Sequence, residues 1–174
     1  MKKIVIADAG PLIALARIGQ LSLLPRLFSH VLLTDLVANE LTLGVFTDTA
    51  VLRDALAADW LETVQTTDQD LLQCRDWVNL HQIDMGEASA LVLASTHAAL
   101  GDDVLIVIDD ARGRQAAQHA SLNILGTAGL LILAKKANMI AEVKPLLLAL
   151  QAAQYFLSER LLQAVLKLAD EKQD

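Results

Sequence analysis

The sequence is poor in several residue types, and each shortage argues against a class of protein. Cys74 is the only cysteine among 174 residues, so no internal disulfide can form, and we expect a reducing, cytoplasmic location. One cysteine and four histidines also argue against a zinc site. No apolar run reaches the roughly 18 residues of a membrane span. The run that follows Lys2 and Lys3 is too short for a signal peptide.

Positive charge is scarce and unevenly distributed. The chain has 14 Lys and Arg against 21 Asp and Glu, and no lysine lies between Ile4 and Ala134. A protein with this balance is not expected to bind nucleic acid in general. The lack of lysine also argues against phosphohydrolases that grip phosphate with one. Carboxylates that converge in this region would need a hard divalent cation to supply the missing positive charge.

Short apolar stretches alternate with helical patterns along the chain. We therefore expect one domain over residues 1–174 with an α/β fold, a three-layer α/β/α sandwich around a central parallel sheet of about five strands. The expected strands are 4–6, 31–34, 60–65, 104–108 and 123–125, with 60–65 at an edge. The main expected helices are 20–29, 35–44, 47–59, 68–80, 84–100, 111–120, 126–138, 140–153 and 158–169. The polar tail from Asp170 is expected to fray.

The N-terminal stretch places an acid at the end of a strand. Ile4 to Ile6 form an apolar run typical of a strand buried on both faces. Asp8 follows this run, and Gly10-Pro11 then begins a helix. Asp8 should therefore lie at the carboxyl end of a strand, where open α/β sheets bind ligands. A helix cap is an equally good interpretation of Asp8 alone.

Four further acids occupy the ends of predicted strands or helices. Glu40 lies on an otherwise apolar helix face, so it is either exposed at the edge of that face or turned inward. Glu87 completes the capping pattern Asp84-x-x-Glu87 in the first turn of a helix, yet such a residue can also point at the edge of the sheet. Asp109 and Asp110 end the strongest predicted strand. One of the two suffices as a helix cap, so the second requires another explanation.

Carboxylates that converge in one cleft repel each other and stay ionised only when a cation neutralises them. Mg²⁺ and Mn²⁺ bind through a few carboxylates and waters, which leaves positions for phosphate oxygens and an attacking water. Such a site suits in-line attack on a phosphodiester. The sequence has no Ser-His-Asp arrangement, Walker loop or dinucleotide-binding glycine pattern that would indicate a different chemistry.

The ordered acids resemble those of the PIN domain family. They are Asp8 in IVIADAGPLIAL, Glu40 in VANEL, Glu87 in DMGEASAL, and Asp109-Asp110 in VIDDARGRQAA. The GTAGLL segment at 126–131 is similar to that of the VapC-like prokaryotic branch. The resemblance covers about residues 3–150 and implies a small α/β/α sandwich with a parallel sheet.

The resemblance also implies an activity. Members of the family are typically Mg²⁺- or Mn²⁺-dependent ribonucleases, often the toxins of toxin–antitoxin pairs and often homodimers. By resemblance Asp8, Glu87 and either Asp109 or Asp110 would be metal ligands, and Glu40 would complete the acidic cluster. We therefore expect an endoribonuclease that acts on RNA, with an antitoxin as a possible partner. The alternative is a catalytically weak PIN-like module that acts by binding another protein.

Other residues carry weaker hypotheses. Arg112 and Arg114 are the only cations near the expected cleft and could steer phosphate, although solvated arginines are the commoner case. Thr127 is expected to cap a helix, with a phosphate or water contact as the alternative. No aromatic stacking platform or basic stripe is visible. The apolar helices at about 140–170 either pack on the core or form a partner surface.

Overall fold

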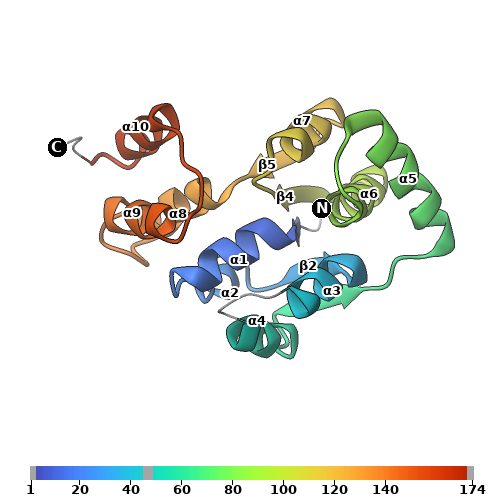
Figure 1. Cartoon of the computed structure of the whole chain (residues 1–174), viewed down its shortest axis with the longest axis horizontal. Helices are drawn as coiled ribbons and strands as arrows, with labels where there is room; N and C mark the ends of the chain where they lie inside the picture. The colour runs from blue at the N-terminus through green and yellow to red at the C-terminus, as the bar shows by residue number, and fades with distance from the viewer. Residues whose placement is uncertain (1–2, 45–48, 172–174) are drawn as a thin grey trace.

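Five parallel strands form one sheet in the order β3-β2-β1-β4-β5 (Figure 1). The computed structural model describes residues 3–44 and 49–171. The strands are β1 (Lys3–Ala7), β2 (Val31–Thr34), β3 (Leu61–Val64), β4 (Asp103–Val107) and β5 (Asn123–Leu125). The sheet confirms the predicted fold class, and β3 lies at its edge as expected. At its centre β1 pairs with β4 from Lys3 opposite Asp103 to Ala7 opposite Val107.

Helices cover both faces of the sheet because its side chains alternate between two cores. Val5 and Val107 face one core, whereas Ile4 and Ile106 face the other. The first core is covered by α1 (Ala9–Arg17), α2 (Leu23–Phe28), α3 (Asp35–Leu43), α4 (Thr49–Leu56), α8 (Thr127–Lys136), α9 (Lys144–Ala152) and α10 (Glu159–Leu168). The second is covered by α5 (Asp68–His81), α6 (Met85–Ala99) and α7 (Ala111–His119). Figure 1 shows α8, α9 and α10 together on one side, away from α5 and α6.

Several helices are shorter than expected. The helix predicted over 20–29 is only α2, and the one predicted over 140–153 begins at Lys144. The predicted helix 47–59 is observed as α4, and residues 47–48 lie outside the described part of the chain. No helix in the described segments has the length and apolar character needed to cross a bilayer.

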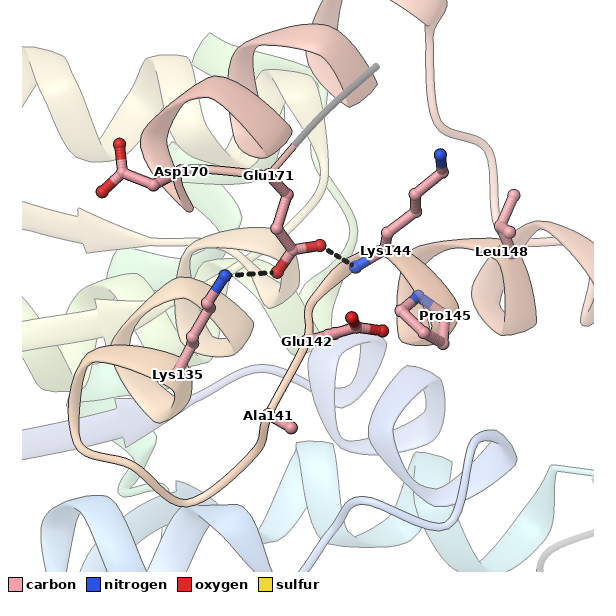
Figure 2. Close-up of a pocket in the computed structure, with 8 residues that line it drawn as sticks. All are labelled: Lys135, Ala141, Glu142, Lys144, Pro145, Leu148, Asp170 and Glu171. Atoms are coloured by element: carbon pink, nitrogen blue, oxygen red, sulfur yellow. Dashed lines mark hydrogen bonds and ion pairs between the residues drawn. The ribbon is translucent and has the colours of Figure 1, made fainter. Parts of the chain in front are cut away.

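The prediction that the tail frays from Asp170 is wrong at Glu171, whose side chain is 11% exposed. One oxygen of Glu171 accepts hydrogen bonds from Lys135 Nζ at 2.7 Å and from the Val143 amide at 2.6 Å. The other accepts from the Lys144 amide at 2.8 Å (Figure 2). Burial opposes the charge, but these bonds outweigh it and hold the pKa of Glu171 below its usual value. A residue near the end of the chain therefore caps α9.

Candidate acidic site

Asp8 lies at the carboxyl end of β1, beside β4. Its backbone amide donates to the Val107 carbonyl at 2.9 Å, which extends the β1–β4 ladder by one residue. Asp8 occupies the N-cap position of α1, but its side chain makes no capping hydrogen bond. The residue is only 6% exposed. The carboxylate is therefore buried at the edge of the sheet without serving as the helix cap that the sequence allowed.

The pKa of Asp8 is raised from its ordinary 3.8 to about 7. Burial is the main cause of this rise, and the negative charges of Glu40 and Asp84 add to it. The nearby amides of Ala9 and Gly10 lower the pKa and offset part of the rise. Repulsion from Glu40 and Asp84 requires that α3 and α6 bring both carboxylates toward the end of β1.

Glu87, in the first turn of α6, has its pKa raised from 4.5 to about 7. Burial is again the largest cause, followed by the charge of Asp84 and then by those of Asp110 and Asp8. Glu40 on α3 is exposed as a residue, but its carboxylate is partly desolvated, and this desolvation and the charge of Asp84 raise its pKa. These five acids, Asp8, Glu40, Asp84, Glu87 and Asp110, are called the acidic cluster below.

A glycine keeps two of these acids close together. A Cβ atom at Gly86 would lie 3.0 Å from Glu40 Oε2 and 3.3 Å from Asp84 Oδ1. Both carboxylates therefore approach the first turn of α6 at a point that carries no side chain. The sequence left Glu40 either exposed at the edge of the apolar face or turned inward. In the structure the residue is exposed, and its carboxylate still reaches the cluster.

The sequence pattern identifies Asp84 only as part of a helix cap. Asp84 Oδ1 accepts from the Glu87 amide at 2.8 Å, and Glu87 Oε2 accepts from the Asp84 amide at 3.2 Å, which is a complete capping box. Asp84 also raises the pKa of Asp8, Glu40 and Glu87. The sequence signal for a place in the cluster is that Asp84 caps a helix whose N-terminus faces the carboxyl edge of the sheet.

Asp109 and Asp110 each cap a different helix. Asp110 Oδ1 accepts from the amides of Arg112 at 2.7 Å and Gly113 at 2.9 Å, at the start of α7. Asp109 instead accepts from the Thr127 amide at 2.8 Å and from Thr127 Oγ1 at 2.6 Å, at the start of α8. The second aspartate thus has a structural explanation. Of the two, it is the charge of Asp110 that acts on Glu87.

Asp109 belongs to a second group of residues, which is distinct from the acidic cluster. Its charge and a hydrogen bond reinforce burial in raising the pKa of Tyr155. Arg114 Nη1 donates to the Ile108 carbonyl at 3.4 Å and lies close to Asp109 across Gly126. This second group therefore binds the loops after β4 and β5 to the segment that precedes α10.

The other candidate residues also make contacts within the protein. Arg112 is exposed, and its Nη1 donates to the Gln82 carbonyl at 3.1 Å, which ties the start of α7 to the turn before α6. Thr127 is fully buried and is the first residue of α8, and its amide and hydroxyl both donate to Asp109. The expectation that Thr127 caps this helix is therefore wrong, because Asp109 supplies the cap. The structure thus places Arg112 beside the acidic cluster, whereas Arg114 and Thr127 lie next to Asp109 in the second group.

The donor chemistry of the acidic cluster fits a hard divalent cation. Carboxylates are its ionisable groups, and none of the five forms a salt bridge with another described residue. Residues 3–44 and 49–171 contain no group of three His, Cys, Asp or Glu side chains arranged to hold a metal ion directly. Mg²⁺ commonly takes only one or two protein carboxylates and completes its shell with water. The cluster is compatible with that mode of binding.

A parallel sheet between two helical layers, with acids gathered at its carboxyl edge, defines an α/β/α sandwich. A sequence model of the PIN domain family matches residues 4–171, and the chain belongs to that family. No curated protein matches the chain. PIN domains are generally nucleases that use divalent metal ions. The match extends beyond residue 150 and includes the C-terminal helices.

Proposed function

We propose that this protein is a Mg²⁺- or Mn²⁺-dependent endoribonuclease whose active site is the acidic cluster. The observation that carries the proposal is the mutual repulsion of the cluster carboxylates at the end of β1, with no salt bridge to a described residue. Such an arrangement favours a bound divalent cation over an empty site.

In this proposal Asp8, Glu87 and Asp110 would bind the cation, one or two of them directly and the rest through its waters. Glu40 and Asp84 would accept hydrogen bonds from the same waters. Asp110 is preferred to Asp109 because both oxygens of Asp109 are engaged by Thr127. Asp109 is then a positioning residue that fixes the end of β4.

The chemistry is hydrolysis of a phosphodiester by water. A divalent cation, when bound, supplies positive charge against the phosphate and makes a water more acidic. Glu87 and Asp8 orient the attacking water by accepting its hydrogen bonds. Arg112, exposed beside the cluster, is our candidate for a contact with substrate phosphate. Arg114 and Thr127 support the site through Asp109.

We further propose that the protein is the cytoplasmic toxin of a toxin–antitoxin pair from the VapC-like branch, and that it acts as a homodimer. The order of the acids and the GTAGLL segment support this assignment. Expression of the wild type should arrest growth, whereas expression of Asp8→Asn should not. Growth arrest by both would contradict a toxin role for the nuclease site.

One observation favours the alternative of a catalytically weak module that acts through protein binding. Arg112 and Arg114 both donate to backbone carbonyls of the same chain, and the net charge is −7. In that case the acidic edge would receive a cationic protein partner in place of RNA.

Cleavage of a mixed pool of single-stranded and structured RNA separates the two proposals. The wild type is compared with Asp8→Asn in Mg²⁺, Mn²⁺ or EDTA, and with Asp54→Asn, which removes an exposed acid on α4. We expect cleavage that needs metal, is lost in Asp8→Asn and is unchanged in Asp54→Asn. Equal inactivity of all three proteins, with no Mn²⁺ binding by calorimetry, would reject the nuclease.

A further inference from the structure

A cavity of about 540 Å³ lies between α5 and α7. Its lining residues are Asp76, Trp77, Leu80, His81, Ala116, His119 and Ala120. The ring centroids of Trp77 and His81 are 5.2 Å apart, and those of His81 and His119 are 5.8 Å apart. Three aromatic rings therefore follow one another along the wall of one cavity.

The sequence pattern shows no aromatic stacking platform, and these three rings come together only in the fold. The three rings come from two helices that are distant in the sequence. Only the packing of α5 against α7, on the second core, brings His81 and His119 together. The remaining wall is made largely of small or aliphatic side chains, and Asp76 is the one acid that lines it.

The cavity is connected to the acidic cluster through both of its helices. Asp110 caps the start of α7, and α5 leads through Gln82 to Asp84. His119, at the far end of α7, is about 14 Å from Asp110 along the helix axis, at the rise of an α-helix. Arg112 bridges the two helices between these points through its bond to the Gln82 carbonyl.

We propose that this cavity binds an unpaired base of single-stranded RNA whose scissile phosphate lies at the acidic cluster. Aromatic rings stack on any base, which is how proteins hold single strands without duplex geometry. In this proposal Arg112, between the acidic cluster and the cavity, contacts the connecting phosphates, and the charge of Asp76 disfavours a phosphate in the cavity itself. The inference rests on the proposed function for its substrate, but base binding can be tested without cleavage.

The two tryptophans allow a direct test. Trp77 lines the cavity, whereas Trp60 packs against the core on the other face of the sheet. The full chain in EDTA is titrated with adenosine or uridine 5′-monophosphate, and with ribose 5-phosphate as the probe that lacks a base. The indole N–H signals are followed by NMR. We expect the nucleotides to shift the Trp77 signal and leave Trp60 unchanged, and ribose 5-phosphate to shift neither.

A pair of histidine variants tests the same cavity. His119→Ala removes an exposed ring from the wall, and His30→Ala removes an exposed ring that pairs with Glu62 elsewhere. Loss of one stacking partner should weaken nucleotide binding about fivefold in His119→Ala and leave binding by His30→Ala unchanged. In RNA cleavage, His119→Ala should raise KM by a similar factor with kcat unchanged.

The outcomes distinguish this inference from the proposed nuclease. A Trp77 shift that ribose 5-phosphate produces equally, or no shift with any nucleotide, overturns base binding even if RNA is cleaved. Unchanged nucleotide affinity in His119→Ala also overturns it and would leave a protein side chain as the occupant to test. Base-dependent shifts in a protein that cleaves no RNA would support the cavity and reject the nuclease.

Discussion

Replacing Asp8 with asparagine should stabilise the metal-free protein at pH 8. Asp8 is 6% exposed, and its pKa is raised from 3.8 to about 7, chiefly by burial and then by Glu40 and Asp84. The folded state therefore binds a proton more tightly than the unfolded state. The contribution of Asp8 to stability is therefore fully present below pH 3.8, falls as pH rises from 3.8 to about 7, and is lost above about pH 7.

The size of the effect follows from the shift. About three pKa units at 1.36 kcal/mol each set a ceiling of about 4 kcal/mol on the cost of the ionised carboxylate at pH 8. Asparagine has nearly the same size but brings amide hydrogens that also need partners, and an unsatisfied donor costs about 1–3 kcal/mol. We therefore expect a net gain of about 1–3 kcal/mol in the free energy of unfolding.

Urea unfolding in EDTA at pH 5 and pH 8 measures this effect. The advantage of Asp8→Asn should narrow at pH 5, because the folded wild type then holds the proton. Asp54→Asn, on the exposed face of α4, should match the wild type at both values. Mn²⁺ should stabilise the wild type and have little effect on Asp8→Asn. An Asp8→Asn protein that is no more stable than the wild type at pH 8 would refute the electrostatic argument.

Three further changes test the site and its supports. Gly86→Ala places a methyl group 3.0 Å from Glu40 Oε2, so calorimetry should show weaker Mn²⁺ binding with an unchanged melting temperature; equal affinity would contradict the close approach. Thr127→Val removes the hydroxyl bond to Asp109 and should cost about 1–2 kcal/mol in urea unfolding. Glu171→Gln should lose about 1 kcal/mol at pH 7. Because the pKa of Glu171 is lowered, its contribution is present above pH 4.5 and disappears as pH falls through the folded value, so a deficit that persists in acid would argue against a role for its charge.

The strands of the sheet could be predicted because the pattern of apolar residues in each strand matches the burial of that strand in the structure. Ile4 to Ile6 and the strand that ends before Asp109 read as apolar runs because both of their faces are covered by helices. The alternating pattern of residues 60–65 likewise identified an edge strand. In these segments each residue's environment depends mainly on its own strand and its immediate neighbours.

Helix boundaries depended on residues that a local pattern does not include. The helix predicted from residue 140 begins at Lys144, where Pro145 suits the first turn and Glu171 caps the amides from the end of the chain. The contact between Asp109 and Thr127 could not be predicted for the same reason, because Thr127 starts another helix. Both contacts are long-range in sequence and short-range in space.

The local interpretation of the acids and the functional one proved compatible. Asp84, Glu87 and Asp110 do cap helices, as their positions in the sequence indicated. α7 follows β4 and α6 leads back into β4, so both helices begin at the carboxyl edge of the sheet and their caps converge there. Capping does not explain why the pKa of Glu87 is raised, nor why the pKa of Asp8, which makes no capping hydrogen bond, is raised. Neutral capping residues such as serine or threonine would cap these helices without the repulsion between carboxylates. The proposed metal chemistry therefore explains why the sequence has several negatively charged residues at this edge.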